Sequence, residues 1–379
     1  MLDNSQIDVL KAERRALHAH PEVSGQEYAT QERIVRFLNT YTKAKVIKVG
    51  GTGVMATFDS GKPGKNTLFR GDTDALPIQE INTFEHRSVF EGISHKCGHD
   101  GHTAILLGLA MVLSDNPIKN GKVRLVFQPA EEDGMGAKAI LADERFSGEE
   151  IDYVFALHNL PGYPKNQIVV KENEFTSNVK SIIIKLFGKT SHAAEPEKGY
   201  NPSRVIADLL LYAEENTHNH PESKDFFLMT PVFLTMGSTS YGISAGYGEV
   251  HLTLRGWSTQ LMKEKCIRLE SFVKTKSSEY NLLPKTEWLQ EFFANENHPE
   301  AVELIRLAAK QNTLPILEKV TPFRWGEDFG LFTQKFKGAM FGIGAGEKTP
   351  ALHNPDYDFP DDILPNAVAM FHKIIDQLH

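Results

Sequence analysis

Hydrophobic positions in the first 160 residues follow two alternating spacings. Segments in which apolar residues recur every three or four positions alternate with short apolar runs of strand length. The first spacing is typical of amphipathic helices and the second of buried strands. We expect helices at about residues 7–19, 27–38, 102–113 and 136–141, and strands at 45–49, 54–58, 67–70, 122–128 and 153–157. This alternation predicts an α/β fold with a largely parallel sheet.

The middle of the chain follows a different order of elements. Strands and helices are expected at residues 181–188, 202–215, 231–236, 249–257, 260–279 and 283–289. Their order is β-α-β-β-α-β, which is the ferredoxin-like pattern. After it, a strand is expected at residues 339–343 and a long helix at 360–378. We therefore predict a mainly parallel-sheet catalytic domain of residues 1–174 and 291–379, interrupted by a ferredoxin-like domain of residues 175–290.

Composition narrows the class of protein. The 379 residues carry a net charge of −8 without runs of Lys or Arg, so nucleic acid and anionic membranes are not expected partners. The longest apolar run, residues 103–113, is about half of a membrane span. The N-terminus has no apolar segment typical of a signal peptide. Two cysteines imply no disulfide framework, and we expect a reducing, cytoplasmic location.

Acidic and imidazole side chains follow three of the expected strands. Asp72 and Asp74 follow residues 67–70, Glu131 and Glu132 follow residues 122–128, and His158 follows residues 153–157. In open α/β sheets, ligands bind beyond the carboxyl ends of the strands. These side chains are therefore expected along one rim, as metal ligands or as acid/base groups.

Cys97 and His99 add a thiol and an imidazole on either side of Gly98, and His353 stands before the last helix. Thiolate and imidazole suit borderline divalent metals, and in an extended loop this spacing points both side chains at one centre. Each residue also has an ordinary structural interpretation: a buried thiol, an acidic helix start, a turn aspartate or a core histidine. Their shared position at strand-to-loop junctions favours a common site.

At these residues the sequence resembles the amidohydrolase branch of the aminoacylase/carboxypeptidase metallopeptidases. That branch includes hippurate hydrolases, N-acetyl-diaminopimelate deacetylases and plant indoleacetyl-amino-acid hydrolases. The matching blocks span nearly the whole chain in the family's order. They are LHAHPE from Leu17, GTGV from Gly51, RGDTDALP from Arg70, CGHDGHT from Cys97, QPAEE from Gln128, SHAA from Ser191, GEDF from Gly326 and LHNP from Leu352.

The resemblance implies a role for each candidate. The implied ligands of two divalent metal ions, with the cysteine bridging them, are Cys97, His99, Glu132, His158 and His353. Glu131 matches the general base, and Asp72 matches an aspartate that lies behind a metal ligand and tunes it. His192 matches a histidine that stabilises the developing oxyanion. In relatives this histidine can come from a partner subunit, because the inserted domain mediates dimerisation.

The implied activity is metal-dependent hydrolysis of the amide bond of N-acyl amino acids or of related small amides and dipeptides. The acyl group stays open, and so does the metal, because such a donor set accepts zinc, manganese, cobalt or nickel. A homodimer or higher homo-oligomer through the inserted domain is expected. Arg70 replaces the histidine ligand of the two-zinc branches, and residues 195–202 read EPEKGYNP where a methionine and a histidine are usual. Arg255 is either a partner for a substrate carboxylate or a surface cation.

Two other functions are compatible with parts of the pattern. A cysteine-nucleophile amidase would use Cys97 with His99 or His102, but it leaves the remaining candidate ligands unexplained. A catalytically inactive binding relative would be expected to have lost at least one ligand or Glu131. The metal-dependent hydrolase accounts for all of these residues and is our principal hypothesis.

Overall fold

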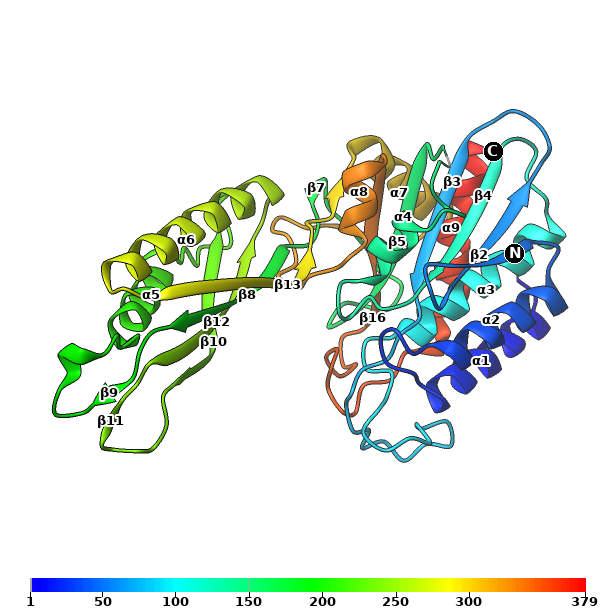
Figure 1. The fold of residues 1–379 in the computed structure, drawn as a ribbon. Coiled ribbons are helices and arrows are strands. Elements are labelled where there is room, and N and C mark those ends of the chain that lie inside the picture. Colours follow the sequence, from blue (N-terminus) through cyan, green and yellow to red (C-terminus); the bar gives the residue numbers. More distant parts are fainter. Residues whose placement is uncertain (1, 149) are drawn as a thin grey trace. The chain divides into compact units, whose positions relative to one another are not determined.

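The computed structural model describes residues 2–148 and 150–379, which form two compact units (Figure 1). The first unit comprises the chain up to Phe175, Asn295–Val320 and Glu327–His379. The second comprises Thr176–Ala294 and the short segment Thr321–Gly326. The sequence pattern gave boundaries at residues 174/175 and 290/291 and gave no sign of the short segment. Thr321–Gly326 joins the second unit because Phe323 bridges to Thr176 and the Arg324 carbonyl accepts a 2.7 Å hydrogen bond from Ser177.

The first unit is built on an eight-stranded sheet in the order β1-β2-β4-β3-β5-β16-β6-β15. Strands β4, β3, β5 and β16 run parallel to one another, and β15 runs parallel to β6. Antiparallel pairing occurs between β1 and β2, β2 and β4, and β16 and β6. The predicted α/β class with a mixed, mainly parallel sheet is confirmed. In sheet order, the strands are Lys45–Val49, Gly53–Asp59, Lys122–Gln128, Asn66–Asp72, Tyr153–Pro161, Gly338–Gly346, Ile168–Val170 and Ile316–Glu318.

Helices of the first unit cover this sheet (Figure 1), and one of them is buried from His99 to Ser114. That helix, α3 (His99–Asp115), contacts α1, α9 and β3. A helix that is apolar all round is expected in a core rather than at a surface. Helix α1 begins with a capping box between Asp3 and Gln6. The remaining bounds are α1 Asn4–Ala19, α2 Tyr28–Tyr41, α4 Gly136–Ala142, α7 Pro299–Gln311, α8 Gly330–Lys335 and α9 Leu364–Leu378, with the 3₁₀ turn η2 Asp361–Ile363.

The second unit has the order β8-α5-β10-β12-α6-β13 along the chain. Its antiparallel sheet has the spatial order β10-β12-β8-β13, so the predicted ferredoxin-like arrangement is confirmed. Helices α5 and α6 share one apolar core with this sheet. The bounds are β8 Asn178–Phe187, α5 Ser203–Glu215, β10 Phe227–Met236, β12 Tyr247–Gly256, α6 Thr259–Glu279 and β13 Leu283–Phe292. Smaller elements are β7 Asn173–Glu174, β9 Ser191–His192, η1 Pro196–Lys198, β11 Ile243–Ser244 and β14 Glu296–Asn297.

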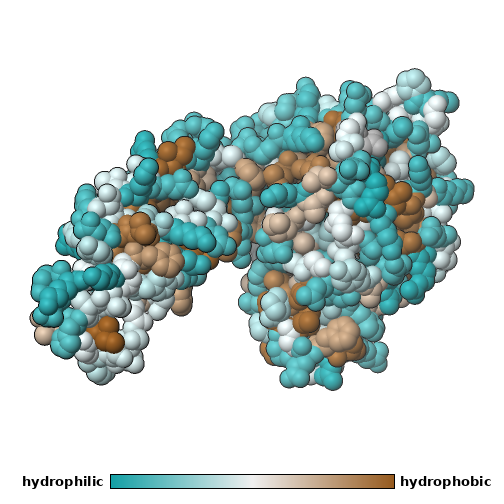
Figure 2. Space-filling view, viewed as in Figure 1, coloured by the Kyte–Doolittle hydropathy of each residue, from teal (hydrophilic) through white to brown (hydrophobic). Residues whose placement is uncertain are grey.

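The sequence pattern left unassigned the strand β6 and several elements between β13 and β16. Helix α7 starts at Pro299 and was missed, although its buried residues recur at helical spacing: Ala301, Val302, Ile305, Ala308 and Ala309. Strands β6 and β15 have three residues each, too few to show a period. Within the part of the chain that the structure describes, no helix is long and apolar enough for a membrane span. On the face drawn in Figure 2, apolar residues form separate areas among hydrophilic ones.

Candidate metal centre

The donor side chains collect at the carboxyl ends of the central strands of the first unit. Strands β3 and β4 run in register, with Asp72 opposite Gln128, so the segments that follow them begin at the same edge. His158 lies in the last part of β5, which pairs with β3. The start of α3 adds His99 to this edge through a 3.0 Å contact of its Nδ1 with the Asp74 carbonyl. The sheet therefore brings these distant parts of the sequence together.

A left-handed glycine sets the geometry of the Cys97–His99 pair. Gly98 has φ 93° and caps α3, so His99 is the first helical residue and not part of an extended loop as expected. A β-carbon at position 98 would lie 2.5 Å from Asn159 Oδ1 and 2.8 Å from the hydroxyl of Tyr357. Only glycine fits this conformation and this space. The bend brings donor atoms of Cys97, His99 and His158 within 4.8 Å of one another.

Cys97 also belongs to a second group of donors. Ligand atoms of Cys97, Glu132 and His353 lie within 4.8 Å of one another. Glu132 Oε1 lies 3.5 Å from His353 Nε2 and 3.8 Å from His99 Nε2. The two donor groups thus share the thiol of Cys97. The Glu132 carboxylate lies between His353 of one group and His99 of the other. A thiol, imidazoles and a carboxylate are ligands for zinc and similar divalent metals.

The imidazoles are oriented by hydrogen bonds at their inner nitrogens. His99 Nδ1 lies 3.0 Å from the carbonyl of Asp74, and His158 Nδ1 lies 2.8 Å from the carbonyl of Asn159. A carbonyl only accepts, so each Nδ1 carries a proton, and Nε2 is the nitrogen of each ring that could coordinate a metal. Among the described residues, His99 Nε2 and Glu132 Oε1 are buried without a hydrogen-bond partner. Because buried polar atoms without partners are costly, these atoms fit a bound cation.

Burial and the charges of Glu132 and Glu131 raise the pKa of the Cys97 thiol well above its usual value. A thiolate at this position therefore needs a cation beside it. Metal coordination supplies such a cation and deprotonates a thiol. The same environment opposes a free nucleophilic thiolate, which requires a lowered pKa.

Asp72 lies beside His99, with its Oδ2 3.6 Å from His99 Nε2, and joins two further side chains. Its Oδ2 accepts a 2.6 Å hydrogen bond from Arg70, and its Oδ1 lies 2.6 Å from His102 Nδ1. Burial opposes ionisation, but His99, Arg70 and His102 hold the pKa of Asp72 well below its usual value. His102 Nε2 accepts the backbone N–H of Asn159 at 3.2 Å, so neither nitrogen of His102 is free for a metal.

Glu131 faces a second acidic cluster. Its Oε1 lies 3.4 Å from the backbone N–H of Asp328, and its Oε2 lies 4.0 Å from His99 Nε2. Burial and the charges of Glu327, Glu132 and Asp328 raise the pKa of Glu131 well above its usual value, against a lowering effect of Arg70. A carboxylate with a raised pKa is suited to accepting a proton.

Glu131 and Glu132 diverge because the chain turns between them and β4. Extended backbone would also send neighbouring side chains to opposite sides, but this segment is not extended. Ala130 has φ 51°, and the Gly134 N–H donates to the Glu131 carbonyl at 2.8 Å, which closes a turn. The turn directs Glu132 to the thiol and Glu131 to the acidic cluster.

Sequence reasoning assigned no role to Glu327 and Asp328, although both lie in a matching block. Arg70 is fully buried and pairs with Glu327 and Asp328, at 2.8 Å each, as well as with Asp72. Gln128 Nε2 adds a 2.8 Å bond to Asp328. The replacement of a histidine by Arg70 was the signal for this cluster, because a buried guanidinium requires several carboxylates.

His192 and Arg255 belong to the second unit, whereas the donor groups lie entirely in the first. His192 is exposed in β9, and its Nδ1 accepts the N–H of Ala194 at 3.0 Å. Arg255 on β12 donates a 2.6 Å hydrogen bond to the carbonyl of Arg324, which opposes its interpretation as a solvated surface cation. Their contacts with substrate remain predictions.

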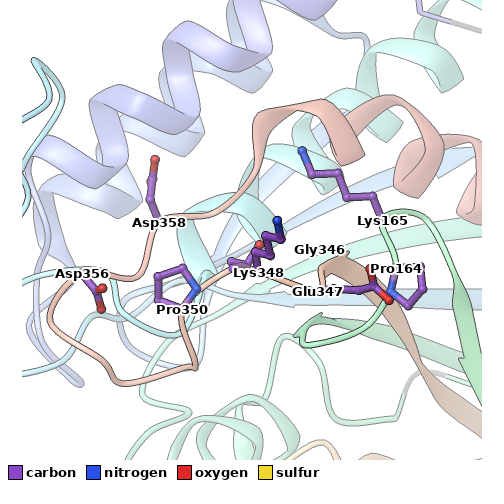
Figure 3. A pocket seen from close by; sticks show the side chains of 9 residues that line it. Pro164, Lys165, Gly346, Glu347, Lys348, Pro350, Asp356 and Asp358 are labelled. Atoms are coloured by element: carbon purple, nitrogen blue, oxygen red, sulfur yellow. The ribbon is translucent and has the colours of Figure 1, made fainter.

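The loop that follows β16 lines an open cavity of about 590 Å³ (Figure 3). Lys165, Glu347, Lys348, Asp356 and Asp358 surround it, and Asp356 and Asp358 project from the loop in different directions. None of the candidate metal ligands lines this cavity. The donor groups are therefore a separate site, although His353 lies on the same loop.

Comparison with known families and proteins gives consistent matches. Residues 68–377 match the model of peptidase family M20/M25/M40. N-acetyldiaminopimelate deacetylase of Priestia megaterium is 29% identical over 362 residues, covering 95% of this chain and 96% of the relative. The enzyme of the same name from a Geobacillus species is 30% identical over 368 residues, covering 97% and 95%.

Solved structures share the fold over the full length. The YXEP protein of Bacillus subtilis, described as a dinuclear metal binding peptidase from the M20 family, superposes with a TM-score of 0.84. It is 26% identical, and the match covers 99% of each chain. The aminobenzoyl-glutamate utilization protein of Klebsiella pneumoniae gives a TM-score of 0.73 at 20% identity, covering 98% of this chain and 95% of the other.

Proposed function

Because the chain belongs to peptidase family M20/M25/M40 and is a metal-dependent hydrolase that acts on C–N bonds, we propose that it cleaves the amide bond of an N-acyl amino acid. The observation that carries this proposal is the pair of donor groups that share Cys97 beside the buried carboxylate of Glu131. The deacetylase relatives make an N-acetyl amino acid the first substrate to test. N-benzoyl and indoleacetyl amino acids and dipeptides are alternatives of the same chemical class.

The donor set would hold two divalent ions, because Cys97 belongs to both donor groups. The five ligands are Cys97, His99, Glu132, His158 and His353. A bound divalent ion lowers the pKa of its water from about 16 to about 7 and polarises a carbonyl. The orphaned nitrogen of His99 and oxygen of Glu132 support this assignment. Zinc, manganese, cobalt and nickel all suit these ligands, so the metal is decided by experiment.

Glu131 moves the proton. Its carboxylate accepts a proton from the attacking water, whose oxygen forms the new C–O bond with the amide carbon. The same carboxylic acid then gives the proton to the leaving nitrogen as the C–N bond breaks, so the amine departs neutral. The raised pKa of Glu131 suits it to hold the proton between these steps. Asp72 orients His102 at its Nδ1, and Asp74 orients His99 at its Nδ1.

The second unit supplies His192 and Arg255 in this proposal. His192 is exposed, and its Nδ1 accepts from Ala194, so its Nε2 is left as the donor for an oxyanion. Arg255 is the partner for the carboxylate of the amino acid. One nitrogen of its guanidinium donates to the Arg324 carbonyl, and the guanidinium has further N–H donors for a carboxylate.

Strand β10 is the surface that we assign to self-association. It lies at one edge of the second sheet, and its exposed apolar residues include Val232, Phe233, Leu234 and Met236. The other edge strand, β13, carries Lys285, Glu287 and Glu291, whereas β10 has no charged residue. Charges protect an edge strand from pairing, and an uncharged apolar edge favours it. A second copy of the chain is therefore the proposed partner.

The test of the function begins with protein stripped of metal by a chelator. Manganese, zinc, cobalt or nickel is added back separately, and amine release is measured from N-acetyl, N-benzoyl and indoleacetyl amino acids and a few dipeptides. We expect metal-restored release from at least one of them. Release that is indifferent to chelator but abolished by a thiol alkylator would replace this proposal with the cysteine-nucleophile amidase. Failure to bind any metal would contradict both the proposed ligand set and the mechanism.

A further inference from the structure

Lys96 is a fully buried lysine directly before Cys97. Its Nζ lies 2.6 Å from Glu80 Oε1 and donates a 2.8 Å hydrogen bond to the backbone carbonyl of Tyr357. Its own backbone carbonyl accepts the N–H of His353 at 2.7 Å. Lys96 thus joins the segment of Cys97 to the loop of His353 at two residues of that loop, His353 and Tyr357.

Tyr357 extends this connection to a third segment. Its side chain is fully buried, and its hydroxyl accepts a 2.5 Å hydrogen bond from Asn159 Nδ2. Asn159 directly follows His158, and its carbonyl is the acceptor that orients the His158 imidazole. The chain of contacts from Lys96 through Tyr357 to Asn159 therefore links the backbone segments of three candidate ligands.

We propose that Lys96 is a positioning residue that fixes the segments of Cys97, His353 and His158 at the separation a pair of metal ions requires. This inference rests on the metal site of the proposed function. Metal ligands must be held within a few tenths of an ångström, and the groups behind them set this geometry. His353 needs such support most, because its backbone has φ 65° and its side chain is half exposed.

The choice of lysine supports a positioning role over a stabilising one. Burying an ammonium costs free energy, and apolar residues of similar volume in place of a buried ion pair are often neutral or stabilising. Glu80 also has partners other than Lys96, because it accepts from Ser88 N–H at 2.7 Å and from Asn82 Nδ2 at 3.0 Å, and lies 3.1 Å from His18 Nε2. What lysine adds is a donor directed at the Tyr357 carbonyl.

The test uses Lys96→Met, whose unbranched side chain is one atom shorter and lacks the ammonium donors. Lys96→Met/Glu80→Gln is made in parallel, because the second change removes the carboxylate left without its cation. Arg306→Gln is the matched control, since Arg306 pairs with Glu172 and Glu318 in the same unit and contacts no candidate ligand. Metal stoichiometry, metal affinity against a competing chelator, and the thiolate-to-cobalt absorption of the cobalt-loaded protein are measured, together with stability to urea.

We expect both Lys96 variants to bind at least one ion about tenfold or more weakly than wild type, with altered thiolate-to-cobalt absorption, because loss of a group behind a ligand typically costs about 10–100-fold in affinity. Arg306→Gln should match wild type in both measurements. Recovery of wild-type affinity in the double variant would make Lys96 a charge partner of Glu80 only and overturn the inference. Unchanged affinity in both variants would also overturn it.

Tyr357→Phe provides a second test that does not disturb a buried charge. It removes only the hydroxyl that accepts from Asn159, and we expect a weaker bound ion with near-normal stability. Wild-type affinity in this variant would break the link to His158 and contradict the three-segment arrangement. Failure of the wild-type protein itself to bind metal would instead contradict the proposed function, so the two ideas fail by different results.

Discussion

Asp72 Oδ1 lies 2.6 Å from His102 Nδ1, and this short contact decides which nitrogen of His102 carries its proton. The other nitrogen accepts the backbone N–H of Asn159 and must therefore be unprotonated. His102 is thus held neutral as a connector between β3 and the end of β5. It lies within ligand distance of His99 without offering a free lone pair.

His102→Ala should therefore destabilise the fold without reducing metal stoichiometry. It leaves Asp72 Oδ1 and the Asn159 N–H buried and unpaired, at a cost of about 1–3 kcal/mol for each group. Urea unfolding measures the loss, and metal analysis of the folded protein measures the stoichiometry. His102→Asn is the control, because its amide can still donate to Asp72. Loss of one bound ion at unchanged stability would show that His102 is a ligand.

Glu131→Gln should reduce turnover by about 10²-fold or more, because a positioned general base typically contributes about 10²–10⁴-fold. The amide has nearly the shape of the carboxylate but cannot accept the water proton. Metal content should stay at the wild-type value, as measured by elemental analysis. Asp133→Asn is the neighbouring control, since Asp133 is exposed and bonds only the Met135 N–H among the described contacts. Turnover near wild type in Glu131→Gln would remove the base assignment.

Cys97→Ala should lose bound metal as well as activity, because the thiol belongs to both donor groups. Cys266→Ala is the matched control. Cys266 is half buried in the second unit, where burial raises the pKa of its thiol to about 11. It should keep full metal content and turnover. Full metal stoichiometry in Cys97→Ala would remove Cys97 from the ligand set.

His18 predicts a specific dependence of stability on pH. Burial opposes its protonation, but hydrogen bonds with Asp100 and Glu80 outweigh burial and raise the pKa of His18 to about 9. The folded pKa exceeds the unfolded value of about 6.5, so its stabilisation is complete below pH 6.5 and is lost as pH rises through about 9. The contribution is up to about 3 kcal/mol at about 1.4 kcal/mol per pKa unit.

This dependence is measured as the difference in unfolding free energy between wild type and His18→Gln at several pH values. The difference should shrink between pH 6.5 and 9.5. His20→Gln, two residues along the chain, is the control, because His20 bonds only the Ala16 carbonyl through its side chain in the described contacts. A difference that stays constant over this range would mean that His18 does not change charge on folding.

Leu234→Lys should shift the protein from dimer to monomer if two copies pair through β10, because a buried lysine at the strand edge opposes pairing. Analytical ultracentrifugation at several concentrations measures the state. Leu283→Lys places the same charge on β13, the opposite edge strand, where Leu283 is 74% exposed. This control should not change the oligomeric state. A dimer that persists in Leu234→Lys would place the contact elsewhere.

Sequence patterns identified the elements whose apolar period is strong. Strands β1 and β4 occur at the expected residues, 45–49 and 122–128, and the order of the second unit follows the predicted pattern. Helix α7 was missed although its buried residues recur at helical spacing. The hydrophobic pattern could not predict the geometry of the turns. The left-handed conformations of Gly98 and Ala130 depend on tertiary neighbours, yet they direct Cys97, His99 and Glu132 into one site.

The partners of the site residues were less predictable than the candidates themselves. Residue type and position at strand ends pointed to Glu131 and His158. The Arg70 cluster requires Glu327 and Asp328 from a segment more than 250 residues away along the chain. Hydrophobic periodicity carries no information on such a pairing. The same is true of Lys96, whose Tyr357 contact spans 261 residues.

Thr321–Gly326 changes what it means to call the second unit an insertion. With this segment, the polypeptide passes between the two units four times, after Phe175, Ala294, Val320 and Gly326, and not twice. A fragment of residues 176–294 would leave out part of its own unit. The missing part includes the Arg324 carbonyl, which accepts hydrogen bonds from Ser177 and Arg255. The last passage also leads directly into Glu327 and Asp328, the partners of Arg70. The two later passages thus tie the folding of the smaller unit to a segment that begins 27 residues beyond Ala294.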